Sequence, residues 1–170
     1  MKSIFLYFTC ALFIFISACS NDNNKADKVT DNAIINRGGA VNSIKLIGLK
    51  EYEAIKNDSI GKITIANFYA SWCPPCRQEI PGFINSYNKF KDDLEIIGLS
   101  LDPDDNSALK FINEMGINYK VYRADESLQK RFNIMTIPVS VIYKADGSLY
   151  NVHFGYLSES EIERLIKTLK

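Results

Sequence analysis

The sequence contains few residues of the types that hold metal ions. Its 170 residues include one histidine, His153, and four cysteines. A structural zinc site is usually built from four cysteine or histidine ligands, and this composition offers little beyond one closely spaced cysteine pair. We therefore expect no resident metal ion and no cofactor, and we assign His153 no catalytic role.

An excess of charge of one sign and a membrane-spanning apolar run are also missing. Lysine and arginine together number 20, aspartate and glutamate also number 20, and there is no basic run, so nucleic-acid binding is not expected. An apolar stretch covers residues 4–16, but a transmembrane helix needs about 20 apolar residues. The chain has no internal repeats, and its length beyond the amino-terminal segment suits one domain.

The cysteine pair lies in the motif Trp72-Cys73-Pro74-Pro75-Cys76, after an apolar run and before an amphipathic segment. Cys73 would stand at a helix N-terminus, where unpaired N–H groups and the helix dipole lower the pKa of a thiol. Pro74 and Pro75 have no N–H groups and stiffen the helix start. We interpret the pair as a reversible dithiol/disulfide. Half of a zinc site and an inert structural disulfide are the alternatives.

The amino-terminal residues are typical of an export signal. Lys2 precedes the apolar stretch, and Ile16-Ser17-Ala18-Cys19 resembles a bacterial lipobox. The resemblance implies that residues 1–18 are a lipoprotein signal peptide and that Cys19 carries lipid, which anchors the protein to a membrane. With Cys10 removed and Cys19 modified, only the pair in the motif stays free. A plain signal peptide or an uncleaved anchor is the alternative.

The residues after the lipobox predict a tether. Ser20 follows the cysteine, which resembles the pattern that diderm bacteria send to the outer membrane. Residues 19–42 are rich in Asn, Asp, Lys, Gly and Ser and predict a flexible linker, leaving residues 43–170 as the folded domain. We expect this domain to lie in the cell envelope facing the periplasm, or on the extracytoplasmic face of the membrane, where disulfides persist.

Hydrophobic periodicity predicts alternating strands and helices in the domain. Strands are expected at residues 41–46, 62–69, 94–100, 119–122, 139–144 and 148–154, the last two as an antiparallel hairpin. Helices are expected at residues 49–56, 108–115 and 126–132, from Cys73 through Phe90 with a kink at Pro81, and after the capping box at Ser158. This order indicates an α/β fold with a mixed sheet flanked by helices.

These residues resemble a thioredoxin fold, and more narrowly the membrane-anchored TlpA/ResA-like (CcmG/DsbE-like) thioredoxins. The resemblance spans roughly residues 44–170. It is carried by residues 67–81, which surround the cysteine motif, by Thr136-Ile137-Pro138 and by Asp146-Gly147 in the hairpin. It implies that residues 106–122 form the helix–strand insertion of that family.

The resemblance also implies roles for individual residues. Cys73 would be the exposed thiolate that attacks a partner disulfide, and Cys76, less exposed, would resolve the mixed disulfide. Pro138 would be cis and pack against the disulfide, where its ring keeps metal from the dithiol. The backbone of Ile137 would pair with an extended substrate, and Trp72 would cover the disulfide as a lid.

Glu79 is the acidic residue of greatest interest. It follows Cys73 by six residues, at the place where the family carries a glutamate that tunes the thiol pKa and contributes to partner selection. Asn67 aligns with the buried aspartate of ordinary thioredoxins and cannot take a proton. Glu79 could therefore accept the proton of Cys76 through water; a solvated charge on the helix face is the alternative. Arg77 is interpreted as a surface residue.

The activity implied is thiol-disulfide exchange, in the direction of protein-disulfide reduction. Clients would be proteins with disulfides, including apocytochrome c during cytochrome c maturation or proteins with copper-site cysteines, and a transmembrane thiol carrier like DsbD or CcdA would supply electrons. We expect a monomer. The alternatives are a peroxiredoxin-like thiol peroxidase, although the Pro-x-x-x-Thr-x-x-Cys context is missing around Cys73, and a lipid-anchored copper metallochaperone.

Overall fold

The structure is a computed structural model that describes residues 41–170. The expected signal peptide, the expected lipidation site at Cys19, Ser20 with its expected role in sorting, and the expected tether up to residue 40 lie outside the described residues. Within residues 41–170, no helix is long and apolar enough to cross a membrane.

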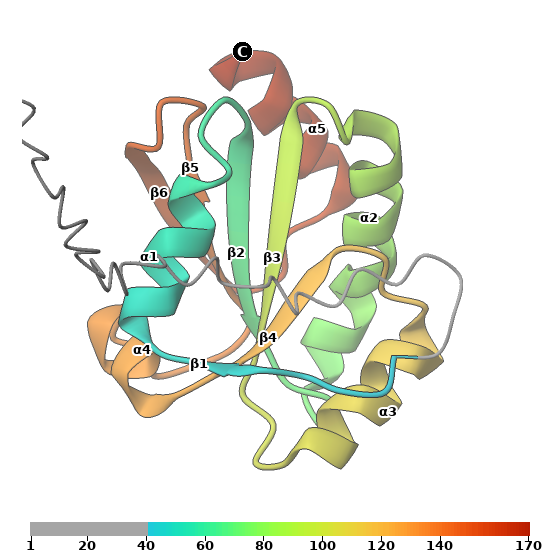
Figure 1. Cartoon of the computed structure of the whole chain (residues 1–170). Helices are drawn as coiled ribbons and strands as arrows, with labels where there is room; N and C mark the ends of the chain where they lie inside the picture. The colour runs from blue at the N-terminus through green and yellow to red at the C-terminus, as the bar shows by residue number, and fades with distance from the viewer. Residues whose placement is uncertain (1–40) are drawn as a thin grey trace, which may run out of the picture. The chain divides into compact units, whose positions relative to one another are not determined.

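A six-stranded mixed sheet forms the centre of the fold, in the order β1-β4-β3-β2-β5-β6 (Figure 1). Its strands are β1 (Leu46–Ile47), β2 (Ile63–Tyr69), β3 (Leu94–Ser100), β4 (Lys120–Ala124), β5 (Val139–Tyr143) and β6 (Leu149–Phe154). The β2 strand pairs in parallel with β3 and antiparallel with β5. All seven residues of β2 and of β3 are buried, as expected for central strands with both faces covered.

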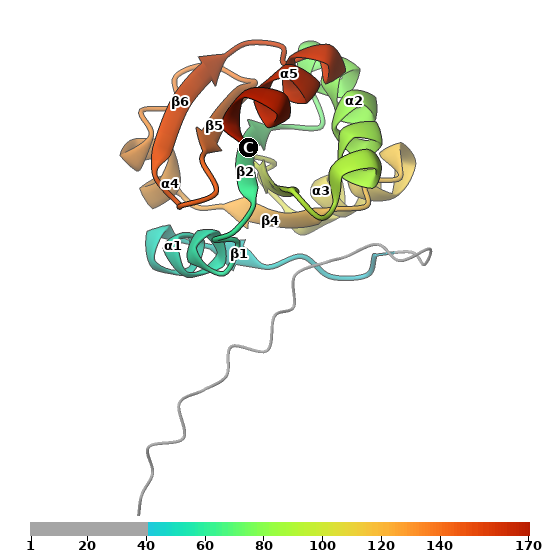
Figure 2. The same cartoon turned by 90° about the horizontal axis from the view of Figure 1, so that it is seen from above.

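Within residues 41–170, five helices cover the two faces of this sheet: α1 (Leu49–Asn57), α2 (Pro74–Phe90), α3 (Asp105–Met115), α4 (Glu126–Arg131) and α5 (Glu159–Leu169). Apolar residues of α2, α3 and α5 pack together in one core, and those of α1 and α4 contribute to a second core. The helices α1 and α2 therefore lie on opposite sides of the sheet (Figure 2). The α/β fold with helices on both faces is confirmed.

The insertion contributes α3 and β4, and its boundaries follow from capping residues. The side chain of Asp104 accepts a hydrogen bond from the backbone N–H of Ser107 at the start of α3. Gly116 ends the helix with φ of 64°, a left-handed conformation that costs glycine little. The predicted helix end at Gly116 is confirmed. The helix α2 continues through Pro81 to Phe90.

The amino-terminal edge differs from the expected pattern. Only Leu46 and Ile47 form β1, because only these two residues pair with β4, so the prediction of a strand over residues 41–46 is wrong. Val41, within the expected tether, is buried at 8% exposure. Its N–H donates to Oδ1 of Asn113 at 2.9 Å, and Nδ2 of Asn113 donates to its carbonyl at 3.1 Å. Val41 therefore already packs on the domain.

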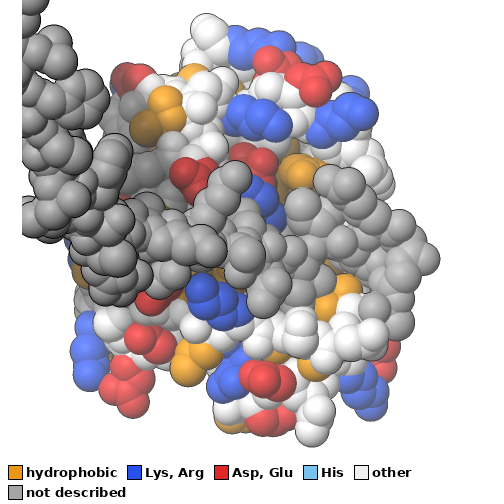
Figure 3. Space-filling model, in the orientation of Figure 1, with side chains coloured by type: hydrophobic (Ala, Val, Ile, Leu, Met, Phe, Trp, Pro, Cys, Tyr) orange, Lys and Arg blue, Asp and Glu red, His pale blue; other side chains and the backbone are white. Residues whose placement is uncertain are grey.

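Charged side chains of both signs are interspersed on the face that Figure 3 shows. Exposed ion pairs such as Lys130–Glu126, 2.9 Å apart on α4, are typical of this surface. The mixed distribution agrees with the equal numbers of acidic and basic residues in the sequence.

Candidate active site

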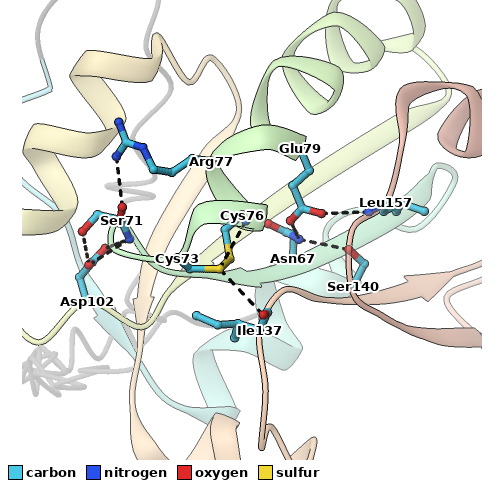
Figure 4. Close-up of a disulfide and its surroundings, with 10 residues drawn as sticks. All are labelled: Asn67, Ser71, Cys73, Cys76, Arg77, Glu79, Asp102, Ile137, Ser140 and Leu157. Carbon is cyan, nitrogen blue, oxygen red and sulfur yellow. Dashed lines mark hydrogen bonds between the residues drawn. A yellow bond between two sulfur atoms is a disulfide. The ribbon is translucent and has the colours of Figure 1, made fainter.

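The two cysteines of the motif form a disulfide at the start of α2 (Figure 4). Cys73 is the N-cap residue of the helix, and Cys76 lies in its first turn. Cys73 is 3% exposed and Cys76 is fully buried. Both residues are thus buried in the disulfide form, and Cys73 is far less exposed than the sequence analysis predicts.

The first backbone N–H that α2 can offer belongs to Cys76, because Pro74 and Pro75 occupy the preceding positions and have no N–H. This group donates to Sγ of Cys73 at 3.3 Å. The sulfur therefore lies at the positive end of the helix dipole with one N–H pointing at it, an arrangement that stabilises a thiolate after reduction.

A cavity of about 530 Å³ opens beside the disulfide, and Cys73 forms part of its wall. Trp72, which also lines the cavity, is 66% exposed, so it is a surface residue beside the disulfide and not a core residue. The Ile137–Pro138 peptide bond is cis, as the family resemblance implies. The carbonyl oxygen of Ile137 lies 3.9 Å from Sγ of Cys73.

Glu79 lies inside the protein, three residues after Cys76 on the buried face of α2, and is 1% exposed. One carboxylate oxygen accepts a hydrogen bond from Nδ2 of Asn67 at 2.8 Å, and the other accepts one from the backbone N–H of Leu157 at 3.0 Å. Nδ2 of Asn67 also donates to the hydroxyl of Ser140 at 3.1 Å. The alternative of a solvated charge on the helix face is therefore wrong.

Burial raises the pKa of Glu79 to about 7, because the ionised carboxylate loses its hydration inside the protein. The hydrogen bonds from Leu157 and Asn67 lower the pKa and offset part of this effect. Glu79 can therefore exchange a proton near neutral pH, which an ordinary glutamate does not do.

A second polar cluster fixes the loop that leads into the motif. The backbone N–H of Ser71 lies 3.1 Å and 3.3 Å from the two carboxylate oxygens of Asp102, and the Ser71 hydroxyl donates to the nearer one at 2.7 Å. The Ser71 carbonyl accepts from Nη1 of Arg77 at 3.1 Å. All three polar groups of Ser71 are thus engaged, immediately before Trp72 (Figure 4).

Arg77 connects this loop to the insertion. Its guanidinium lies over the ring of Phe111 in α3, 4.9 Å from the ring centre, and 3.8 Å from a carboxylate oxygen of Glu114. The side chain of Arg77 is 43% exposed, which agrees with its interpretation as a surface residue. His153 lies in β6, where Nε2 is 3.1 Å from the carbonyl oxygen of Tyr156.

Sequence reasoning missed Ser71, Asp102 and part of the cavity wall. Asp102 stands two residues after the end of the buried strand β3, which is a weak signal for a side chain at the carboxyl end of a sheet. Met135 and Leu101 also line the cavity. Their sequence positions resemble ordinary loop residues, and only the fold brings them to Cys73.

Comparison with known proteins assigns the family. The family model described as thioredoxin-like matches residues 61–149. This match covers more than half of the chain and includes the disulfide and the cis proline, so the chain belongs to the thioredoxin-like family.

The relatives place it near thiol-disulfide oxidoreductases of the ResA type. The thioredoxin-like protein YneN of Bacillus subtilis (strain 168) is 24% identical over 110 residues, covering 63% of this chain and 65% of YneN. The thiol-disulfide oxidoreductase ResA of the same strain is 26% identical over 116 residues, covering 67% of this chain and 65% of ResA. The chain thus spans slightly less than two thirds of either relative.

A solved structure agrees with both the fold and the family. The thiol:disulfide interchange protein of the thioredoxin family from Chlorobium tepidum TLS has a TM-score of 0.63 and 29% sequence identity. The match covers 67% of this chain and 83% of that protein. The thioredoxin-like fold that the sequence motifs imply is therefore confirmed.

Proposed function

We propose that this protein is an extracytoplasmic thiol-disulfide oxidoreductase that reduces disulfides in client proteins. The observation that carries the proposal is the position of Cys73, whose sulfur stands at the N-terminus of α2 and borders an open cavity. A thiolate is stabilised there, and a client sulfur can approach it. The relatives named thiol-disulfide oxidoreductase or interchange protein support the same chemistry.

The reaction proceeds in two exchange steps. In the reduced protein, the Cys73 thiolate attacks one sulfur of the client disulfide, an S–S bond forms between protein and client, and the second client sulfur leaves as a thiolate that takes up a proton. Cys76 then loses its proton and attacks Sγ of Cys73, which releases the first client sulfur as a thiol. The client gains two electrons and two protons, and the protein retains the Cys73–Cys76 disulfide.

Glu79 accepts the proton that Cys76 must lose in the second step. The two residues are three positions apart in α2, so their side chains share one face of the helix. A base with a pKa of about 7 is half ionised at neutral pH and is therefore well matched to this transfer. Removal of the carboxylate by Glu79→Gln should slow resolution of the mixed disulfide about 10-fold or more.

The cellular setting forms part of the proposal. The lipobox around Cys19 supports a lipid anchor and an envelope location, with Ser20 favouring the outer membrane of a diderm cell. A membrane dithiol protein of the DsbD or CcdA kind would return two electrons to the disulfide after each turnover. Clients include apocytochrome c or proteins whose metal-site cysteines must be kept reduced, and the domain acts as a monomer.

The test combines activity, potential and client trapping. The reduced domain should reduce insulin disulfides, and Cys76→Ala should hold clients covalently on Cys73. A reduction potential near that of the oxidant DsbA, about −120 mV, would contradict a reducing role. Rapid peroxide consumption would favour the thiol peroxidase, and tight copper binding by the dithiol would favour the metallochaperone.

A further inference from the structure

The cavity beside the disulfide has an uncharged lining. Among the described residues that line it, the polar side-chain groups are those of Gln129 and Thr136 and the indole N–H of Trp72, and none is ionisable apart from Cys73 itself. The remaining lining residues include Pro74, Leu101, Ile134, Ile137 and Met135. A client segment held on Cys73 therefore meets an apolar surface that offers no counter-charge.

Met135 is the most exposed of the large apolar residues at this site. It is 81% exposed, and it follows Asn133, whose φ of 48° is unusual for a residue other than glycine. Met135 and Ile134 also line a second cavity of about 410 Å³, which includes Glu126 and Lys130 of α4. Met135 thus lines both the uncharged cavity at the disulfide and a second cavity whose lining includes two charged side chains.

We propose that Met135 is a specificity-determining residue, and that the protein reduces client cysteines flanked by apolar residues in preference to cysteines flanked by charge of either sign. The inference rests on the proposed function, because it assumes that the client cysteine binds Cys73. The client is defined by its chemistry: it is an extended segment whose cysteine has apolar neighbours.

The physical reason is the direction of side chains in an extended segment. Side chains two residues apart point to the same face of an extended chain and lie about 7 Å apart, so the residues two positions before and after the bonded cysteine face the cavity that Cys73 borders. A leucine there loses water from its apolar surface and gains free energy. An aspartate or a lysine would lose hydration without finding a partner. The flexible thioether of Met135 can adapt to apolar side chains of different shapes.

The experiment uses symmetric peptide disulfides, in which two identical peptides are joined through one cysteine each. Three substrates carry leucine, aspartate or lysine two positions before and two positions after the cysteine, with glycine at the two adjacent positions. The pre-reduced domain, freed of reductant, reacts in a single turnover, followed by the fluorescence of Trp72, the only tryptophan in the chain, and by released peptide thiol. We expect the leucine peptide to react about 10-fold faster or more than either charged peptide.

Two charge-bearing variants test the residue itself. Met135→Glu should reduce the preference for the leucine peptide over the lysine peptide several-fold and keep its preference over the aspartate peptide. Met135→Lys should reduce the preference for the leucine peptide over the aspartate peptide several-fold and keep its preference over the lysine peptide. Ile60→Glu is the matched control, because Ile60 is 59% exposed and precedes β2 at the end opposite Cys73. This control should leave all three rates unchanged.

Each contrary result has a separate meaning. Equal rates for the three peptides, with reduction of the small uncharged hydroxyethyl disulfide intact, would overturn the inference and leave the proposed function standing. In the parent protein, one charged peptide could react faster than the leucine peptide and the other more slowly. This result would indicate that net charge steers the substrate, and it would also overturn the inference. A reduced domain that reacts with neither peptides nor hydroxyethyl disulfide would overturn both the inference and the proposed function.

Discussion

Nδ2 of Asn67 lies 2.8 Å from a carboxylate oxygen of Glu79, and this contact joins the central strand β2 to the active-site helix α2. Both residues are buried, at 0% and 1% exposure. The structure thus places a titratable carboxyl in the interior, three residues from Cys76, and holds it with neutral donors. At this contact the strand β2 contributes a neutral amide, and the helix α2 contributes the acid.

The first prediction concerns how the free energy of unfolding depends on pH. The pKa of Glu79 is about 7 in the folded protein against 4.5 for an ordinary glutamate, so the folded state binds more protons between these values. Its contribution to stability is complete below about pH 4.5 and is lost as the pH rises to about 7, a change of roughly 3 kcal/mol. Glu79→Gln should lack this decline.

Urea unfolding of the oxidised domain at several pH values measures the effect. Glu126→Gln is the control, because the side chain of Glu126 is 82% exposed, and it should follow the parent curve. Parallel curves for the parent and Glu79→Gln between pH 4.5 and 7.5 would show that Glu79 does not titrate in this range.

The second prediction concerns thiol reactivity after reduction. The N–H of Cys76 points at Sγ of Cys73 from the first turn of α2, and no N–H group of the described residues donates to the sulfur of Cys76. Cys73 should therefore have a pKa below the ordinary value of about 8.5 and react with iodoacetamide at pH 6.5 about 10-fold faster than Cys76. The variants Cys76→Ala and Cys73→Ala each leave one thiol to measure. Equal rates would contradict the assignment of Cys73 as the attacking sulfur.

The third prediction concerns the contact between Ser71 and Asp102. Asp102 is 3% exposed, and it accepts from the N–H and hydroxyl of Ser71 and from the hydroxyl of Ser100. Ser71→Ala removes one donor and should cost about 1 kcal/mol of unfolding free energy. Asp102→Ala leaves several buried donors without an acceptor and should cost about 2–4 kcal/mol.

A double-mutant cycle distinguishes this contact from general loss of packing. If the hydroxyl of Ser71 stabilises the protein through Asp102, then Ser71→Ala should cost almost nothing once Asp102 is alanine. Urea unfolding of the four proteins provides the values. Additive effects of the two substitutions would mean that the hydroxyl acts elsewhere.

The elements that could be predicted are those encoded locally. Periodicity and turn residues predict the buried strand β2, the helix that ends at Gly116, and the hairpin of β5 and β6. Cys73 at the start of α2 follows from the prolines after it. These features depend on residues that are close in the sequence.

The features that could not be predicted depend on contacts distant in the sequence. The residues around Glu79 come from β2, from β5 and from the chain before α5. The residues next to Glu79 in the sequence therefore do not determine whether its side chain is buried. The partner of Ser71 is 31 residues away. Met135 is 81% exposed although it is apolar, and no local sequence motif predicts this exposure.

The fourth prediction concerns Gly98, which lies in β3 where three neighbouring side chains approach the backbone. A β-carbon at this position would lie 3.1 Å from Cγ2 of Val121, 3.2 Å from Cε1 of Tyr69 and 3.3 Å from Cε2 of Tyr119. All three side chains are fully buried and have little room to move. Gly98→Ala should therefore cost about 1–3 kcal/mol of unfolding free energy by overpacking.

Val121→Ala removes the nearest methyl group, so Gly98→Ala should cost less in that background. An unchanged cost there, measured by urea unfolding, would mean that the two tyrosines set the limit, and a stabilised Gly98→Ala protein would show that the core has room for the methyl group.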